Sequence, residues 1–151
     1  MMSIEFKRLS PDRADEFIAL RIAQLREEGA REDIDLAPAL KSYYERHMKD
    51  DTFIAWTALD GGSIVATGGI SIVEKPPYFS CPTGRIALLS SMYTDARYRR
   101  QGIARHILSL LADEAREREW GVIQITASDM GVKLYSAYGF EKNENFMQLK
   151  L

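Results

Sequence analysis

The chain has 151 residues, of which 46% are hydrophobic and 28% are charged, so its length and composition suit one folded domain. Its 20 basic and 22 acidic residues leave a formal net charge of −2, which gives no reason to expect nucleic acid or an anionic membrane as a partner. The single cysteine excludes an internal disulfide, and the two distant histidines show no metal-ligand spacing, so we expect no metal.

The first part of the chain predicts a strand followed by two helices. Apolar and polar residues alternate at the start of residues 4–9, which is typical of a strand. Ser10, Pro11 and Asp12 then favour a helix start. Apolar residues at helical spacing continue toward Gly29, where this helix should end. A second helix is predicted over about residues 36–49.

A hairpin and a long strand follow. Residues 52–59 and 63–73 are predicted to pair in an antiparallel hairpin, because Asp60-Gly61-Gly62 is typical of a tight turn. The pair Gly68-Gly69 within the second strand indicates a bulge or a close approach of another backbone. An irregular, proline-containing loop then leads to an apolar strand over residues 85–94.

The last third of the chain predicts two more helices and two more strands. The clearest amphipathic helix covers about residues 102–118. A buried strand over residues 122–127, a short helix over residues 131–138 and a closing strand over residues 146–151 complete the chain. The strand–helix–strand unit should pair in parallel, so a mixed sheet with helices on its faces is expected.

The most informative segment is the arginine-rich turn, residues 97–105, which lies between a predicted strand and a predicted helix. It holds four arginines and no acidic residue. The first turn of a helix leaves four backbone N–H groups without partners, and the macrodipole adds positive potential there. Gly102 and Ala104 leave room for close approach of an anion, so this turn predicts a pyrophosphate-like ligand. A solvated loop that binds nothing is the alternative.

Two motifs in this order resemble the GNAT N-acetyltransferase superfamily. The stretch Arg99-Arg100-Gln101-Gly102-Ile103-Ala104 resembles the family's Gln/Arg-x-x-Gly-x-Gly/Ala motif, and Leu134-Tyr135-Ser136-Ala137-Tyr138-Gly139-Phe140 resembles its Leu-Tyr-x-x-x-Gly-Phe motif. The resemblance implies an α/β fold whose mixed, mostly antiparallel sheet of about seven strands is flanked by about four helices. It implies one such domain over residues 1–151 and transfer of an acetyl group from acetyl-CoA to an amine.

By resemblance, two segments would bind acetyl-CoA. The arginine-rich turn would hold the pyrophosphate through Arg99, Arg100, Gln101, Gly102, Ile103, Ala104 and Arg105. The end of the preceding strand would pair with the pantetheine arm through Met92, Tyr93 and Thr94. The family separates its fourth and fifth strands to admit that arm, and the fifth strand here is residues 122–127.

Tyr135 matches the general acid of the family. A phenol near the sulfur can donate a proton to the thiolate that leaves when an amine attacks a thioester. The alternative is that the ring only packs the short helix on the sheet. Tyr93 and Tyr138 are competing candidates, and a backbone N–H near Met92 is a candidate oxyanion donor.

The chain departs from the family pattern at two positions. Ser128 stands where the family often has an asparagine that contacts pantetheine, and an N-cap for the next helix is an equal interpretation. Residues 85–94 contain no acid, although many members place a glutamate base there. Ser90, Ser91, water or a residue from elsewhere must then help to deprotonate the amine, and His47 is a further candidate, with a structural role as its alternative.

The expected acceptor is the primary amine of a small molecule. Residues 26–35 hold five acids that could attract a cation, although an ordinary solvated loop is the preferred interpretation. Two other functions stay open: a non-catalytic acyl-CoA-binding module, and a peptide or protein N-acetyltransferase. No signal-peptide or membrane-spanning segment is visible, so a cytoplasmic location is the default expectation, and a homodimer is expected by analogy alone.

Overall fold

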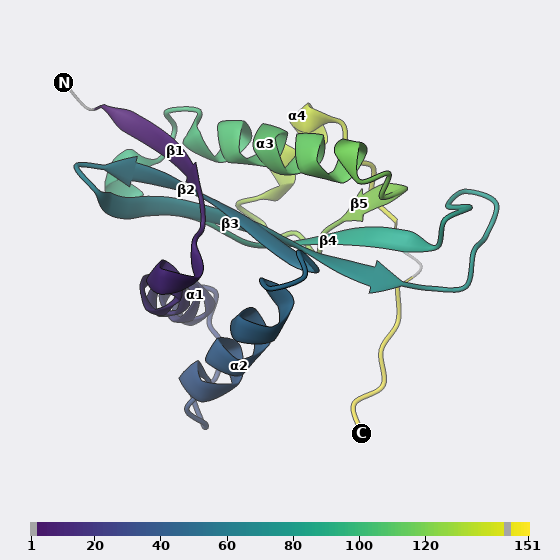
Figure 1. Cartoon of the computed structure of the whole chain (residues 1–151), viewed down its shortest axis with the longest axis horizontal. Helices are drawn as coiled ribbons and strands as arrows, with labels where there is room; N and C mark the ends of the chain where they lie inside the picture. The colour runs from purple at the N-terminus through teal and green to yellow at the C-terminus, as the bar shows by residue number, and fades with distance from the viewer. Residues whose placement is uncertain (1–2, 144–145) are drawn as a thin grey trace.

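A five-stranded sheet forms the centre of the computed structural model, which describes residues 3–143 and 146–151 (Figure 1). The strands lie side by side in chain order: the first four pair antiparallel, and the fifth runs parallel to the fourth. The strands are β1 (Ile4–Arg8), β2 (Phe53–Asp60), β3 (Ser63–Glu74), β4 (Arg85–Thr94) and β5 (Val122–Gln124). The helices are α1 (Ala14–Glu27), α2 (Ala37–His47), α3 (Ile103–Glu117) and α4 (Val132–Tyr138), with short 3-10 turns at Pro11–Arg13 and Ala96–Tyr98.

The helices cover both faces of the sheet (Figure 1). α1 and α2 lie on one face, and α3 and α4 lie on the other. The first face buries an aromatic cluster of Phe17, Tyr44 and Phe53, each at most 3% exposed. The second face buries the apolar stripe of α3, including Ile107 and Leu111, against aliphatic residues of the strands. Each amphipathic helix therefore hides its apolar side on the sheet. None of the described helices is long and apolar enough to cross a membrane.

Most of the predicted elements are confirmed. The hairpin turns at Gly61 and Gly62, whose φ angles of 58° and 85° are the positive values that a two-residue turn requires. Both N-terminal helices are present, but α1 begins at Ala14 after the 3-10 turn. The Ser10 side chain makes no capping hydrogen bond, so the proline at the helix start is the more important signal there.

Two expectations about strands are wrong. The sheet has five strands in the described residues, and not about seven. Residues 146–151 form no strand, although their alternation predicts one. Phe146, Met147, Leu149 and Leu151 are all at least 76% exposed, and this segment leads away from the body of the molecule (Figure 1). Alternating apolar and polar residues favour a strand only where the segment can pair with a sheet edge and pack on an apolar surface. In the structure residues 146–151 do neither.

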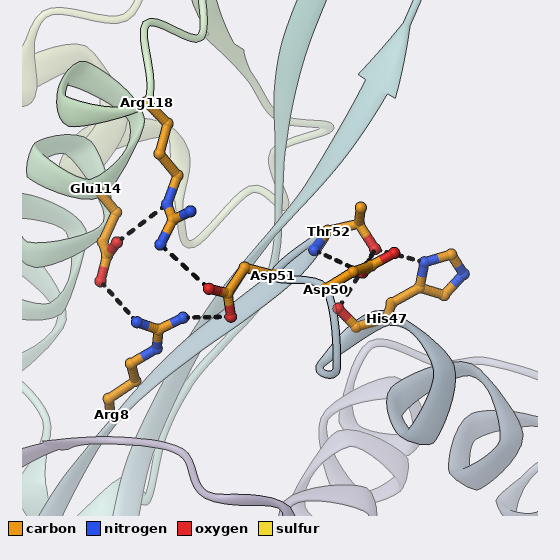
Figure 2. Close-up of polar contacts among 7 residues, drawn as sticks. All are labelled: Arg8, His47, Asp50, Asp51, Thr52, Glu114 and Arg118. Atoms are coloured by element: carbon orange, nitrogen blue, oxygen red, sulfur yellow. Dashed lines mark hydrogen bonds and ion pairs between the residues drawn. The ribbon is translucent and has the colours of Figure 1, made fainter.

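A ring of four charged side chains joins β1, the turn before β2 and α3 (Figure 2). Arg8 contacts Asp51 at 2.7 Å and Glu114 at 3.8 Å. Arg118 closes the ring, at 3.5 Å from Asp51 and 3.3 Å from Glu114. Positive and negative groups alternate around it, so each charge has two opposite neighbours. We call this group the charge ring.

His47 belongs to the turn beside the charge ring and does not line the cleft described below (Figure 2). Its Nδ1 lies 2.7 Å from the Thr52 hydroxyl, which also donates to the Asp50 carboxylate at 2.6 Å. Its ring stacks on Tyr43, with 4.3 Å between the centroids. These contacts support the structural interpretation of His47 as part of the turn between α2 and β2.

Candidate functional site

A bulge bends β4 near its C-terminal end. Ser91 and Met92 lie opposite the single residue Gly68 of β3. Ser91 has a φ of 57°, a left-handed conformation that costs a non-glycine residue about 1–2 kcal/mol. Hydrogen bonds hold it in place: the Thr67 hydroxyl donates to the Ser91 carbonyl at 2.7 Å, and Gln24 Nε2 donates to the Met92 carbonyl at 3.0 Å. The predicted irregularity at Gly68-Gly69 is therefore a bulge in the neighbouring strand.

The strands β4 and β5 separate beyond this pairing. They pair over three positions only, from Ile86 with Val122 to Leu88 with Gln124. The predicted strand over residues 122–127 therefore ends early, since residues 125–127 leave the ladder. A cleft of about 340 Å³ opens there. It is lined by Arg21, Gln24, Glu28, Leu88, Leu89, Ser90, Ser91, Met92, Ile125, Thr126, Ser128 and Tyr135.

One wall of the cleft is a polar face of α1. Arg21, Gln24 and Glu28 follow one another at spacings of three and four residues, which places them in one row along a helix. Gln24 holds the centre of the row: its Oε1 accepts from Arg21 Nη1 at 2.9 Å, and its Nε2 lies 3.4 Å from Glu28 Oε1. The same amide is anchored to the bulge through Met92, so this wall and β4 are joined by a hydrogen bond.

The opposite wall carries Tyr135. Its side chain is 6% exposed and packs edge-on against Phe140, with 5.5 Å between the ring centroids. Gly131 lies against the ring so closely that a Cβ there would be 2.6 Å from Tyr135 Cε2. Burial, and secondly the negative charge of Glu28, raise the pKa of Tyr135 to about 12. The phenol is therefore protonated at neutral pH and can act as a proton donor.

The two competing tyrosines do not line the cleft. Tyr93 lies under the guanidinium of Arg99, 5.9 Å from its ring centroid. Tyr138 lies under the guanidinium of Arg105 at 5.4 Å. Their positions favour Tyr135 among the three as the candidate acid.

Ser128 contacts the start of α4 and also lines the cleft. Its Oγ accepts a hydrogen bond from Gly131 N at 3.2 Å, and its carbonyl accepts from Val132 N at 3.1 Å. Ser128 therefore holds the start of α4. It also lines the cleft, so a ligand in the cleft can reach it.

The turn before α3 has the geometry of an anion site. Arg100 and Gly102 have φ angles of 61° and 79°, and α3 begins at Ile103. The helix bonding starts with His106 N, which donates to the Gly102 carbonyl at 3.1 Å, so the amides of residues 103–105 precede it. A Cβ on Gly102 would meet nothing within 4 Å, which means that the space above the turn is open. The Ile103 side chain is 5% exposed, so this residue offers the turn only its backbone.

Two of the four arginines in the turn make ion pairs with carboxylates of the described residues, and the other two do not. Arg99 contacts Glu27 at 2.7 Å and donates from Nε to the Thr94 carbonyl at 2.8 Å. Arg97 pairs with Asp95 at 3.1 Å. Arg100 and Arg105 make no ion pair with a described carboxylate, and both are exposed. The open pair is therefore the better placed to meet an anion, while Arg99 ties the turn to the end of α1.

The acidic stretch of residues 26–35 is mostly engaged in its own contacts. Its acids contact Arg99 (Glu27), Arg26 (Glu32), Arg31 (Asp33) and the amide of Ala37 (Asp35). Glu28 is the member that lines the cleft. Most of the stretch therefore fits the interpretation as a solvated loop, and Glu28 is exposed but also lines the cleft. Glu28 ends α1, and its spacing from Arg21 and Gln24 was the available signal.

Comparisons with known proteins agree with this geometry. The model of the acetyltransferase (GNAT) family matches residues 15–140. N-acetyltransferase 8 of Rattus norvegicus is 32% identical over 120 residues, 76% of this chain and 50% of that protein, so the chain spans about half the length of this curated relative. A predicted acetyltransferase of Clostridium acetobutylicum, solved with acetyl-CoA, superposes with a TM-score of 0.95 at 28% identity, covering 98% of this chain and 96% of the other. A GCN5-related N-acetyltransferase of Ralstonia eutropha JMP134 shares the fold, with a TM-score of 0.88 at 22% identity over 98% of this chain and 99% of the other. The chain belongs to the GNAT acetyltransferase family.

Proposed function

We propose that the chain is an acetyl-CoA-dependent N-acetyltransferase that acetylates the primary amine of a small molecule. One observation supports the proposal: a protonated, buried phenol and a carboxylate line the same cleft beside β4 and β5, close enough for the charge of Glu28 to act on Tyr135. A volume of about 340 Å³ is at the lower end of ordinary small-molecule pockets. This size supports a small acceptor over a peptide chain.

The residues present fit acetyl-CoA as the co-substrate. The amides at the start of α3, with the exposed guanidiniums of Arg100 and Arg105, would bind the pyrophosphate. The backbone from Met92 to Thr94 lies at the edge that β5 leaves free, which is where a pantetheine arm could pair. Ser128 would add a hydrogen bond from the other side of the cleft.

Tyr135 and Glu28 would divide the proton transfers. The amine nitrogen attacks the thioester carbonyl and forms the amide bond, while the carbon–sulfur bond breaks. The proton lost by the amine goes to the carboxylate of Glu28, and Tyr135 donates a proton to the departing sulfur. Because Glu28 lies in the cleft, the missing acid of β4 is no argument for a non-catalytic module.

A thiol-release assay with acetyl-CoA tests the proposal. The acceptors are polyamines, aminoglycosides, amino acids and short peptides, and the proteins are the wild type, Glu28→Gln and Glu32→Gln. We expect release with a small amine and a fall in kcat/KM of about 10²-fold in Glu28→Gln. Glu32, which is exposed and paired with Arg26, serves as the matched control and should have no effect. Acetyl-CoA binding without thiol release from any acceptor would contradict the proposal, and release with peptides alone would contradict the small acceptor.

A further inference from the structure

Arg21 sits in the cleft without a carboxylate partner. Among the described residues, four arginines make no ion pair: Arg21, Arg46, Arg100 and Arg105. Arg100 and Arg105 belong to the arginine-rich turn, and Arg46 is exposed on α2. Arg21 differs because it is half-buried and lines the cleft. Its guanidinium bonds one neighbour, Gln24 Oε1, and a guanidinium has five N–H donors.

Among the described residues, no carboxylate lies within ion-pair distance of Arg21, although other polar groups surround it. Tyr44 is 3% exposed; burial raises the pKa of this phenol, and a hydrogen bond with Ser91 and the positive charge of Arg21 act against the rise. The Glu28 carboxylate lies on the other side of the Gln24 amide, whose Oε1 is 2.9 Å from Arg21 Nη1 and whose Nε2 is 3.4 Å from Glu28 Oε1. The cleft therefore has a positive end at Arg21 and a negative end at Glu28.

This charge arrangement selects a class of ligand. An amine held near Glu28 and Tyr135 would direct the rest of the molecule along α1 toward Arg21. A carboxylate there could accept two parallel N–H donors from a guanidinium, the geometry in which arginine binds carboxylates best. A simple diamine would instead bring a second positive charge to Arg21 and be repelled.

We propose that the acceptor is an amine that also carries a carboxylate, as in an amino acid, and that Arg21 binds this carboxylate. The inference rests on the proposed acetyl transfer and names its substrate class. Arg21 does not take part in the chemistry of the reacting atoms; it selects and orients the acceptor.

The test compares acceptors that differ only in the carboxylate. Each amino acid is assayed beside its decarboxylated amine and its amide, for example phenylalanine, phenethylamine and phenylalaninamide, with acetyl-CoA and thiol detection. The proteins are the wild type, Arg21→Gln, Arg21→Lys and, as a matched control, Arg46→Gln. We expect the wild type to prefer the carboxylate compounds by at least about 10-fold in kcat/KM, the usual value of a hydrogen bond to a charged group.

The variants separate recognition from folding. Arg21→Gln should lower kcat/KM for the carboxylate compounds at least about 10-fold more than for the decarboxylated amine, Arg21→Lys should retain part of the preference, and Arg46→Gln should match the wild type. Equal use of all three acceptors by the wild type overturns the inference, as does an equal loss with all acceptors in both Arg21 variants. Calorimetry with CoA and the N-acetylated compounds gives a readout without turnover. Arg21-dependent binding of the carboxylate product, in a protein that releases no thiol, would leave the Arg21 site standing while the proposed transfer fails.

Discussion

At the scale of single residues, the proposed chemistry in the cleft depends on how the charge of Glu28 changes the pKa of Tyr135. Tyr135 is buried and Glu28 is exposed, yet the charge of Glu28 adds to the effect of burial on the pKa of Tyr135. Proton transfer to Glu28 during the reaction would remove this charge and make the phenol a stronger acid. The two proposed proton transfers would therefore assist each other.

Replacing Tyr135 by phenylalanine tests the acid at this scale. We expect kcat to fall by about 10²-fold or more, while the dissociation constant of acetyl-CoA stays unchanged, because the ring and its packing remain. Tyr93→Phe and Tyr138→Phe are matched controls from outside the cleft and should retain turnover. An unchanged kcat in Tyr135→Phe, or a loss that is equal in all three variants, would remove Tyr135 from the mechanism.

The same variant has a second readout, in stability against pH. The folded pKa of about 12 lies above the value of about 10 in an unfolded chain, so the folded state holds the phenol proton more tightly. This contribution to stability is complete below pH 10 and is lost as the pH rises toward 12. The unfolding free energy of Tyr135→Phe, measured by urea denaturation, should therefore decline less than that of the wild type over this range.

At the scale of elements, the start of α3 depends on one backbone conformation. Gly102 has a φ of 79°, and a Cβ would meet nothing there, so an alanine at this position would be disfavoured by its conformation and not by a clash. We expect Gly102→Ala to lower the unfolding free energy by about 1 kcal/mol and to weaken acetyl-CoA binding several-fold. Gly61→Ala is the control, because Gly61 has a φ of 58° with the same open space but lies in the hairpin turn. Gly61→Ala should lose stability and keep its affinity for acetyl-CoA. Equal affinities for acetyl-CoA in the two variants would contradict the proposed anion site.

The elements also show what the sequence could and could not predict. The hairpin, the long helix α3 and the place of the arginine-rich turn between β4 and α3 carry their signals in consecutive residues, and the structure confirms these elements. The bulge at Ser91 carries no local signal, because a serine with a φ of 57° is held by contacts with Thr67 and Gln24 from other elements. The proposed roles of Glu28 and Arg21 were not predicted one by one for a similar reason: their spacing places them in one row of a helix, but only the residues packed opposite that row make it the wall of a cleft. Residues 146–151 form no strand because alternating apolar and polar residues show which face a strand would bury, but they do not supply a neighbouring strand to pair with.

At the scale of the whole molecule, the charge ring joins parts of the chain that are far apart in sequence (Figure 2). It links the end of β1, the turn before β2 and α3, so it connects the sheet to the helix that starts at the arginine-rich turn. Isolated surface pairs contribute little, but here each charge has two opposite neighbours, and the Glu114 side chain is only 13% exposed.

Asp51→Asn tests the charge ring. Asparagine tolerates the φ of 58° at this position, so the substitution removes the charge and leaves the backbone preference intact. We expect a loss of about 1 kcal/mol in the unfolding free energy at low salt, and a smaller loss at 1 M salt. Asp113→Asn breaks one exposed pair with Arg116 and should cost at most about 0.5 kcal/mol. Equal losses in the two variants, independent of salt, would show that the ring does not act as a network.

The bulge in β4 has a consequence for how this chain tolerates insertions and deletions. Side chains alternate between the faces of a strand, and a bulge absorbs one extra residue: Ser90 and Tyr93 pair with Gly69 and Thr67, which lie two residues apart on β3 and share a face. Removing Ser91 would therefore keep this pairing in register and would remove the bend from the end of β4. A deletion in the loop of residues 75–84 would leave the bend in place. In an alignment of related chains, a gap at the bulge would therefore mark a straight β4 beside the cleft, whereas a gap in that loop would leave the shape of this edge unchanged.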